Sequence, residues 1–584
     1  MRDLVDAGRA TCSIRGVQPA EILEQESALP LPAEPGAEAR ELSRALGISL
    51  TLADWLHRRG HRDPALTKRF LDPKLSELTP PDAMADRELA AERIAHALGS
   101  SETVCVFGDY DCDGITSAAI TTGILRALGG QVVPLLASRF DGGYGVSPAA
   151  VKRIVASGAK LLITCDCGSS DHETLAEVRR QGIDVIVIDH HLVPDEPLPA
   201  LAFLNPHRPE CGFPYKGLAS CGLSLSVGAA VRARMGRALD VRPWLDLVAI
   251  GTIADVAPLD GDNRALVRAG LARVAQGARP GVRALLELAS FDAARVITGE
   301  DVAFRLAPRL NAPGRLGPPD LALELLLAET HEEARAVAAQ IEQLSKERRA
   351  IQDRMLREAV EEIETEGWAE RAAIVVGREG WNHGIVGIVA GRLASRFGKP
   401  VIVAGFEGER GRGSVRGPAG ARLHDALSQI APVLERFGGH QAAAGVELTF
   451  DKLGEVREAF EAACAAAPAC GEAPIDTDAL VRLLPEDEPD KVLEDLARLE
   501  PCGHQNPAPG VAVEAALLSA REVKGGHLKM ELQLPGGRRL ASFAPSMGSR
   551  AEELSGRVVV VGKLRWDSWR GGRAVEIKVD RIVG

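Results

Sequence analysis

Acidic and histidine residues cluster at the ends of apolar segments in the first half of the sequence. The apolar run at 103–107 leads into Gly-Asp-Tyr-Asp-Cys-Asp-Gly at 108–114, the run at 161–164 leads into Asp166, and the run at 183–188 leads into Asp-His-His. A further carboxylate, Asp255, ends an apolar helix-like run. Near-continuous apolar runs of this kind are typical of parallel strands buried on both faces. Because ligands bind beyond the carboxyl ends of such strands, we expect these side chains to meet at one edge of a sheet.

These side-chain types suit two divalent metal ions acting on a phosphate ester. Carboxylates bind hard cations such as Mn²⁺ and Mg²⁺, and imidazole favours Mn²⁺. Two such ions about 3.5–4 Å apart can activate a water and stabilise the leaving oxygen of a phosphodiester. Gly114 would let the next helix begin close to the acidic loop. The candidate catalytic residues are Asp109, Asp111, Asp113, Asp166, His190, His191 and Asp255.

Each of these motifs has a plainer explanation when it is taken alone. An Asp-x-Asp-x-Asp segment is often a solvated loop or a calcium site, but an EF-hand needs a twelfth-position Glu and flanking helices, whereas a strand is predicted here. Paired histidines after a strand are more often structural. Cys165 and Cys167 could bind zinc with a histidine, but no second cysteine pair supports this. Four polar elements that follow apolar segments together favour the metal site.

Length and charge limit the remaining possibilities. A chain of 584 residues is too long for one core and predicts three or four domains. The net charge of −12 argues against a nucleic-acid partner only as an average, because metal ligands are themselves acidic. No apolar run approaches the ~20 residues of a membrane span, and the N-terminus lacks the apolar core of a signal peptide. We therefore expect a cytoplasmic protein with no membrane partner.

The order of expected elements predicts an α/β protein whose catalytic domain is built on a parallel sheet. The stretch 320–365 has no Gly or Pro and predicts a long helix between two lobes, with a coiled-coil dimer as the competing interpretation. Short strands with Gly turns near the end predict a small β-barrel. The expected parts are an N-terminal lead-in (1–45), a catalytic domain (46–318), a connecting helix (319–366), a second α/β domain (367–465) and the barrel (476–584).

The last thirty residues are basic although the whole chain is acidic. Residues 555–584 hold seven Lys or Arg against three Asp or Glu, and Trp566 and Trp569 are interleaved with arginines. Cations for the backbone and aromatic rings for the bases are what single-strand binding requires. Packing of the tryptophans in the barrel core is the alternative.

The ordered motifs GDYDCDG, TCDCG, DHH and GTIADVAPL resemble the DHH phosphoesterase superfamily and, within it, the RecJ family of exonucleases along nearly the whole chain. LNPHRPECGFPYKGLASCG, APRLNAPGR, GWNHGIVGIVAGRL, GGHQAAAG and PCGHQNPAP carry the same resemblance. It implies a DHH domain, a DHH-associated domain and an OB-fold. It also implies 5′→3′ degradation of single-stranded DNA to 5′-mononucleotides in recombination and repair, by a monomer that works with a single-stranded-DNA-binding protein and a helicase.

The resemblance also implies roles for the candidate ligands. Asp166 would bridge two metals, and Asp111 would hold the first with support from Asp109, directly or through water. The second metal would have three ligands: Asp113, His190 and Asp255. His191 would contact the scissile phosphate, and Asp189 would orient the imidazoles.

Substrate contacts are expected from the second lobe, the cleft and the barrel. Glycines would let backbone N–H groups approach phosphate. The GRGSVRG segment departs from the family's GSGRS-like form, so which arginine binds phosphate stays open. The expected residues are Arg309, Asn311, Arg315, Arg412, Ser414, Arg416, Gly438, Gly439, His440, Trp569 and Arg570. Two alternatives remain: a phosphodiesterase for short oligonucleotides or cyclic dinucleotides, and a non-catalytic replication scaffold.

Overall fold

The computed structural model describes residues 31–141, 143–291, 296–418, 420–439, 441, 443–466, 479–567, 570 and 573–583. The chain divides into two compact units. The first, here called the barrel unit, comprises Met1–Lys68, Ile475–Arg498 and Pro509–Gly584. The second, here called the catalytic unit, comprises Arg69–Pro474 and Leu499–Ala508.

The first lobe of the catalytic unit is built on a five-stranded sheet in the order β2-β1-β3-β4-β5, and every neighbouring pair is parallel. The predicted parallel sheet is therefore confirmed. The apolar runs form the central strands, whose side chains are buried on both faces. The strands are β1 (Thr103–Gly108), β2 (Gln131–Leu136), β3 (Leu161–Cys165), β4 (Asp184–Ile188) and β5 (Ala202–Leu204).

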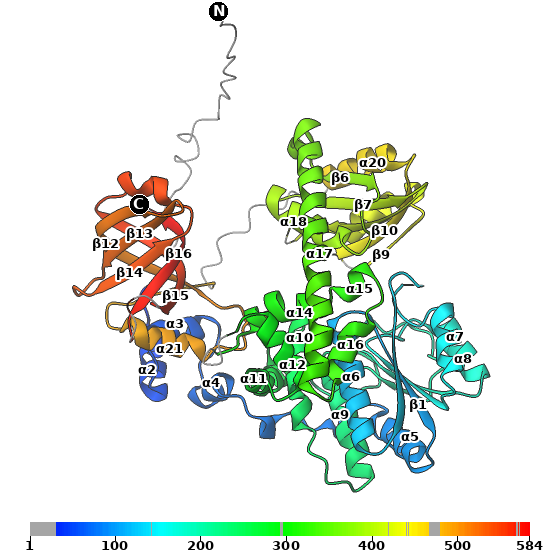
Figure 1. Cartoon of the computed structure of the whole chain (residues 1–584). Helices are drawn as coiled ribbons and strands as arrows, with labels where there is room; N and C mark the ends of the chain where they lie inside the picture. The colour runs from blue at the N-terminus through cyan, green and yellow to red at the C-terminus, as the bar shows by residue number, and fades with distance from the viewer. Residues whose placement is uncertain are drawn as a thin grey trace, which may run out of the picture. The chain divides into compact units, whose positions relative to one another are not determined.

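Helices cover both faces of this sheet (Figure 1). One face shares a core with three helices, and the other face shares a core with two. The first set is α5 (Arg87–Gly99), α6 (Cys112–Ala127) and α9 (Ser220–Arg234), and the second is α7 (Pro148–Ala156) and α8 (His172–Arg180). Further helices extend the first core: α10 (Leu245–Ala254), α11 (Gly261–Gln276), α12 (Pro280–Leu288) and α14 (Ala307–Leu310). The short helix α15 (Pro313–Leu316) instead packs Leu316 against the core of the second lobe.

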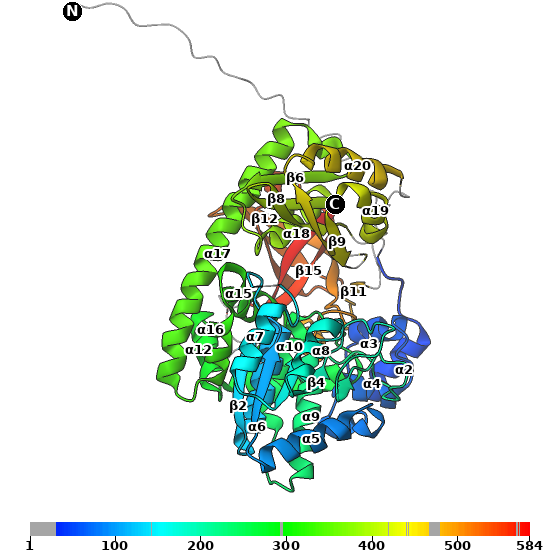
Figure 2. The same ribbon diagram turned by 90° about the vertical axis from the view of Figure 1, so that its right-hand side faces the viewer.

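The helix predicted over 319–366 is two helices, α16 (Asp320–Leu327) and α17 (His331–Thr365). The break occurs because Thr330 caps α17: its hydroxyl accepts from the N–H of Glu333, and the Glu333 carboxylate accepts from the N–H of Thr330. α17 packs against α12 and α16 in the first lobe and against α18 in the second (Figure 2). Among the helices that the structure describes, none is both long and apolar enough to span a lipid bilayer.

The second lobe is a mixed sheet in the order β6-β7-β8-β10-β9. The pair β6–β7 is parallel and the other pairs are antiparallel. Glycines of the second lobe lie in its strands: Gly411 and Gly413 in β8, Gly438 and Gly439 in β9, and Gly445 in β10. The elements are β6 (Ile374–Glu379), α18 (Val386–Phe397), β7 (Val401–Glu407), β8 (Arg410–Arg416), α19 (Leu423–Gln429), β9 (Arg436–Gly439), β10 (Ala443–Thr449) and α20 (Leu453–Ala466).

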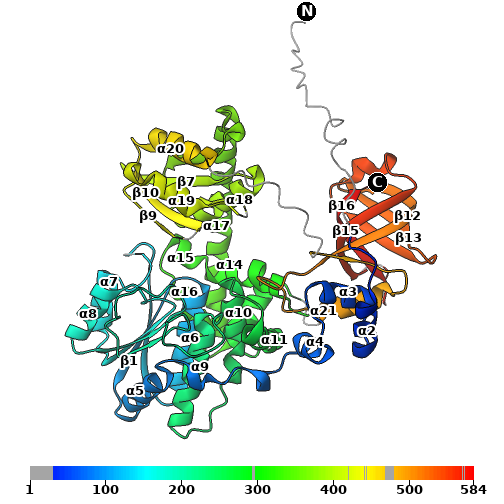
Figure 3. The ribbon, with the colours of Figure 1, turned by 180° about the vertical axis from the view of Figure 1, so that it is seen from behind.

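The barrel unit contains the predicted OB-like barrel (Figure 3). Its strands follow the order β11-β12-β13-β14-β16-β15, and β12 also pairs with β15, which closes the barrel. The elements are β11 (Leu480–Arg482), α21 (Pro489–Ala497), β12 (Gly510–Val523), β13 (His527–Gln533), β14 (Arg539–Ala544), β15 (Arg557–Trp566) and β16 (Val575–Val583).

The start of the described chain belongs to the barrel unit, which differs from the predicted lead-in and from the predicted domain start at residue 46. Helices α2 (Ala37–Leu46), α3 (Leu50–Arg58) and α4 (Pro64–Leu71) form here. The beginning of α3 is held by distant carboxylates: Asp495 accepts from the N–H of Ser49, and Asp487 accepts from that of Thr51, both at 2.7 Å. These acceptors satisfy N–H groups that a helix cannot bond internally.

Conversely, residues 499–508 lie within the predicted barrel domain but belong to the catalytic unit. Arg264 of α11 is buried and donates to the carbonyls of Leu499 at 2.9 Å and Pro501 at 3.2 Å. The Leu259 N–H donates to the carbonyl of His504 at 2.9 Å. This segment is therefore part of the wall of the first lobe.

Candidate active site

Three strand ends place the predicted carboxylates at one edge of the sheet. Asp109 follows β1, Asp166 follows β3 and Asp189 follows β4. Each is fixed by its own N–H, which donates to the next strand: Asp109 to the Cys165 carbonyl at 3.1 Å, and Asp166 to the Ile188 carbonyl at 2.9 Å. The sheet register therefore sets the spacing of these carboxylates.

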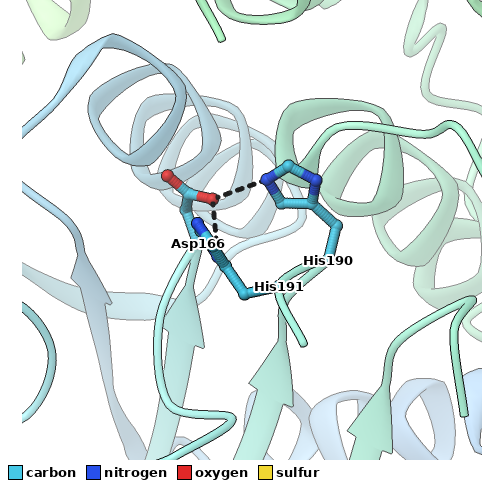
Figure 4. A group of neighbouring side chains, drawn as sticks. All are labelled: Asp166, His190 and His191. Atoms are coloured by element: carbon cyan, nitrogen blue, oxygen red, sulfur yellow. Dashed lines mark ion pairs between the residues drawn. The ribbon is translucent and has the colours of Figure 1, made fainter. Parts of the chain in front are cut away.

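The predicted ligands form three overlapping groups that could hold metal ions. In each group, the ligand atoms lie within 4.8 Å of one another. Asp166 belongs to two of the groups, and its Oδ1 lies 3.3 Å from His190 Nε2 and 3.8 Å from His191 Nδ1 (Figure 4). The groups are Asp109–Asp111–Asp166, Asp113–His190–Asp255 and Asp166–His190–His191.

The electrostatics of this cluster fit divalent cations. His190 Nε2 and Asp109 Oδ1 are buried and have no hydrogen-bond partner among the described residues. Burial and the charge of Asp111 raise the pKa of Asp109 well above its ordinary value, and burial with Asp113 does the same to Asp166. Burial and Asp113 raise the pKa of Asp255 to about 8. Oxygen and imidazole donors with uncompensated negative charge are what Mn²⁺ or Mg²⁺ would neutralise.

Cysteines do not contribute to this cluster. Among the described residues, the groups able to hold a metal consist of Asp and His alone. Cys165 and Cys167 are buried, and burial raises the pKa of the Cys165 thiol to about 12. Because neither cysteine belongs to such a group among the described residues, the zinc alternative is not supported.

Asp111 and Gly114 shape the loop between β1 and α6. The Asp111 carboxylate caps α6 by accepting from the N–H groups of Asp113 at 3.0 Å and Gly114 at 3.1 Å. A Cβ atom on Gly114 would lie 2.6 Å from the backbone N and O of Asp109. The helix therefore begins against the acidic loop in the way that the glycine predicted.

The N-terminus of α9 holds Asp113, a contact that sequence reasoning missed. The Asp113 carboxylate accepts from the N–H groups of Ser220 at 2.8 Å and Cys221 at 3.1 Å. The Ser220 hydroxyl also donates to Asp166 Oδ1 at 3.1 Å. The sequence feature that could have predicted this helix start was a serine directly before an apolar helical run.

Asp189 is a buried carboxylate with hydrogen-bond partners on both oxygens. It accepts from the N–H of His190 at 2.8 Å, from Nδ1 of His191 at 2.8 Å and from the N–H of Ser169 at 3.1 Å. Burial alone would raise the pKa of Asp189, but the hydrogen bond from His191 brings it down to about 2. Burial likewise opposes the charge on His191, yet its bond to Asp189 raises the pKa of the imidazole to about 9. His191 is thus positioned as a cation beside the ligands.

Tyr144 is a second residue that sequence reasoning missed. Its hydroxyl donates to the carbonyl of Asp166 at 3.2 Å and lies 3.1 Å from His191 Nδ1. It is flanked by Gly143 and Gly145, both with positive φ. A lone aromatic residue between glycines in a loop was the available signal.

A cavity of about 870 Å³ adjoins the metal ligands at Tyr110, which lies between Asp109 and Asp111. We call it the arginine cavity. Six predicted substrate contacts line it: Arg315, Arg412, Ser414, Arg416, Gly438 and Gly439. Arg139, His383 and Arg410 line it as well.

Two arginines of this cavity, Arg315 and Arg416, are poorly compensated, whereas Arg412 Nε lies 3.8 Å from Glu447. Arg416 donates to the Ser414 hydroxyl at 2.8 Å, and burial lowers its pKa. Burial and the repulsion from Arg139 lower the pKa of Arg315 to about 10. Among the described residues, neither Arg315 nor Arg416 forms an ion pair with a carboxylate. Such a site favours an anionic ligand.

Other predicted contacts lie elsewhere. Arg309 does not line the arginine cavity, because its Nε pairs with Glu342 of α17 at 2.9 Å. Asn311 is half-buried outside it, with Oδ1 unpartnered among the described residues. His440 and Trp569 lie outside the described residues.

Three arginines of the predicted basic surface of the barrel lie beside carboxylates. Arg565 pairs with Glu576 at 2.7 Å, and Arg573 pairs with Asp490 at 3.2 Å. Arg570 lies 3.7 Å from Asp567. Trp566, for which core packing was the alternative, is 44% exposed. Stacking is therefore better supported at Trp566 than phosphate binding is at these arginines.

The two lobes and the site define a phosphoesterase of the DHH type. The DHH family, N-terminal domain, matches residues 103–252, the DHHA1 domain matches 370–466 and the RecJ OB domain matches 481–581. The single-stranded-DNA-specific exonuclease RecJ of Bacillus subtilis is 34% identical, over 93% of this chain and 69% of the relative. The single-stranded-DNA-specific exonuclease RecJ of Dickeya dadantii is 36% identical, over 84% of this chain and 89% of the relative.

The crystal structure of RecJ from Thermus thermophilus in complex with Mn²⁺ matches with a TM-score of 0.79 and 32% identity, over 95% of this chain and 79% of that chain. The same relative in complex with Mg²⁺ matches with a TM-score of 0.73. The chain belongs to the RecJ family of single-stranded-DNA-specific exonucleases.

Proposed function

We propose that this protein is a single-stranded-DNA-specific exonuclease that removes 5′-mononucleotides in the 5′→3′ direction, in DNA recombination and repair. The observation that carries the proposal is the continuity of two regions within one unit. An acidic cluster that fits two divalent ions adjoins, at Tyr110, a cavity whose lining includes Arg315 and Arg416, which pair with no carboxylate among the described residues. Hydrolysis and recognition of a terminal phosphate therefore have adjacent sites.

The ligand assignment follows the overlap of the three groups. Asp109, Asp111 and Asp166 form one group and would hold the first metal. Asp113, His190 and Asp255 form another and would hold the second. Asp166 Oδ1 lies 3.3 Å from His190 Nε2, so Asp166 would also be able to bind the second metal. When bound, Mn²⁺ or Mg²⁺ would supply the positive charge that activates a water and stabilises the leaving 3′-oxygen.

The remaining residues bind and orient the substrate. His191 is held as a cation by Asp189 and donates a hydrogen bond to a non-bridging oxygen of the scissile phosphate. Arg315, Arg412 and Arg416 bind the terminal phosphate and thereby fix the 5′ end relative to the cluster. The barrel also binds the single strand, with the exposed ring of Trp566 available for stacking on a base.

We further propose that the protein works as a cytoplasmic monomer with a single-stranded-DNA-binding protein and a helicase. A helicase would supply single strands, and the binding protein would keep them extended. These partners are suggested by the requirement for an unpaired substrate. No surface described above is assigned to them.

The test is a time course on single strands labelled at either end, with Mn²⁺, with Mg²⁺ and with a chelator. We expect mononucleotides from the 5′ end first, and little action on blunt duplex. Release from the 3′ end first would overturn the polarity. Preference for dinucleotides over long strands would instead favour a short-oligonucleotide phosphodiesterase. Metal-dependent hydrolysis that disappears in Asp111→Ala and Asp166→Ala would exclude a non-catalytic scaffold.

A further inference from the structure

A second cavity adjoins the metal ligands on the side of His190 and Asp255. We call it the lysine pocket. It has a volume of about 570 Å³ and lies wholly within the catalytic unit. Besides the two ligands, its walls include His207, Tyr215, Lys216 and Gln505.

The two cavities meet the ligand set at different residues. The arginine cavity meets it at Tyr110, next to Asp109 and Asp111, whereas the lysine pocket meets it at His190 and Asp255. A strand with its terminal nucleotide in the arginine cavity and its scissile phosphate at the ligands would continue into the lysine pocket. The next phosphate of the strand would then require a partner there.

Basic donors are available in the lysine pocket. Lys216 donates from Nζ to the carbonyl of Cys211 at 2.9 Å, and an ammonium group has two further N–H donors. Partial burial and the charge of Lys216 lower the pKa of His207, so the two side chains lie close enough to interact electrostatically. Among the described lining residues, Lys216 is the one lysine or arginine.

The acidic residues of the lysine pocket have other partners. Asp260 accepts from the Tyr215 hydroxyl at 2.8 Å. Asp255 belongs to a group that fits a metal ion. With the metal site filled, Lys216 therefore faces the pocket as an uncompensated cation.

The loop that carries these donors is fixed to the metal ligands. The Asn205 side chain donates to the carbonyl of His191 at 2.8 Å and accepts from the N–H of His207 at 2.9 Å. At the other end, Asn263 donates to the carbonyls of Gly217 and Pro258. The distance from Lys216 to the scissile position is therefore set by the fold and not by a free loop.

We propose that Lys216, assisted by His207, binds the phosphate that follows the scissile phosphate on the 3′ side of the strand. This inference rests on the proposed function and extends it to substrate length. A 5′-phosphorylated dinucleotide has the scissile bond but lacks this second phosphate. The same dinucleotide with a 3′-phosphate, or any longer strand, has it.

The test compares these two dinucleotides on the full-length protein with Mn²⁺. For the wild type, the 3′-phosphate should raise kcat/KM by roughly tenfold, since a charge-assisted contact is gained. Lys216→Met keeps the length of the side chain and should abolish this gain, while the rate on the 5′-phosphorylated dinucleotide without a 3′-phosphate stays within about twofold of wild type. Lys216→Arg should restore most of the gain, and His207→Gln should reduce it in part.

The matched control is Lys152→Met, because Lys152 is exposed on α7 of the same unit and lines neither cavity. It should leave the gain unchanged. An equal loss on both dinucleotides in Lys216→Met, or an unchanged gain, would overturn the subsite. Failure of the wild type to degrade long single strands would instead overturn the proposed function, so the two failures are distinguishable.

Discussion

The acidic cluster and the arginine cavity are both charged regions of the catalytic unit, but they are built in different ways. In the cluster, Asp111, Asp113 and Asp189 each accept hydrogen bonds from backbone N–H groups that strands and helix starts hold in place. In the cavity, Arg315 and Arg416 have few partners and project from a helix end and a glycine-rich strand. The first is rigid and suited to small cations, whereas the second relies on its ligand for compensation. Changes in the two regions should therefore have separable effects.

The largest effect is expected from Asp166→Asn. This substitution removes the shared ligand of two groups, so kcat should fall by about three orders of magnitude. Asn tolerates the positive φ of 64° found at this position, so the fold should persist. In the metal-free protein, the change should raise the melting temperature, because a buried charge with a raised pKa is removed. Unchanged Mn²⁺-dependent activity would contradict the shared-ligand role.

Asp189→Asn should reduce kcat by roughly 10- to 100-fold, because the amide cannot hold the His191 imidazolium. KM should change less, since the arginine cavity is untouched. The matched control is Asp184→Asn at the opposite end of β4, where the carboxylate pairs with Arg93. Steady-state kinetics on a short single strand would measure both. An effect confined to KM would contradict the orienting role.

Arg416→Met should raise KM by about tenfold with little change in kcat, because it removes a substrate cation and no metal ligand. The dependence of binding on salt should also weaken by about one phosphate contact. Arg396→Met is the control, since Arg396 pairs with Glu364 outside the cavity. Mn²⁺ should raise the melting temperature of Arg416→Met as much as that of the wild type, because no metal ligand has changed. If Arg416→Met lost this rise, the acidic cluster and the arginine cavity would not be separable.

The smallest effect is on thermal stability as a function of pH. The pKa of Asp255 rises from 3.8 to about 8 on folding, so the stability it contributes is present below pH 3.8 and is lost as pH rises through 8. The metal-free protein should thus melt a few degrees lower at about pH 8.5 than at about pH 6. Adding Mn²⁺ should reduce this change of melting temperature with pH. Asp255→Asn should also reduce it in the metal-free protein. Differential scanning calorimetry with and without a chelator would measure it, and a metal-free melting temperature that rises over this range would contradict the assignment.

The acidic cluster was predictable because its residues follow apolar strands directly in sequence. A single rule, that the carboxyl ends of parallel strands lie at one edge of the sheet, predicted the location of Asp109, Asp166 and Asp189. The contacts of Ser220 and Tyr144 were not predicted, because they depend on how a distant helix and a distant loop pack. Arg309 was misplaced for the same reason: its partner Glu342 lies on another helix.

The barrel shows the limit of counting charges in a short window. The last thirty residues are basic, but carboxylates such as Asp490 and Glu494 lie far away in sequence and pair with Arg573. The barrel topology itself was predictable from strand lengths and glycine turns. Its surface charge was not, because ion pairing is a tertiary property.

The segment 499–508 has a practical consequence for dissecting the enzyme. A chain ended at Pro474 would keep both lobes and every proposed ligand, yet it would leave the buried Arg264 without the carbonyls of Leu499 and Pro501. An orphaned buried guanidinium costs several kcal/mol, so this truncation should be poorly folded. A shorter version of the nuclease would have to carry residues 499–508 after the second lobe, attached through a designed linker. The catalytic unit and the barrel unit are thus interleaved along the chain and cannot be separated by one cut.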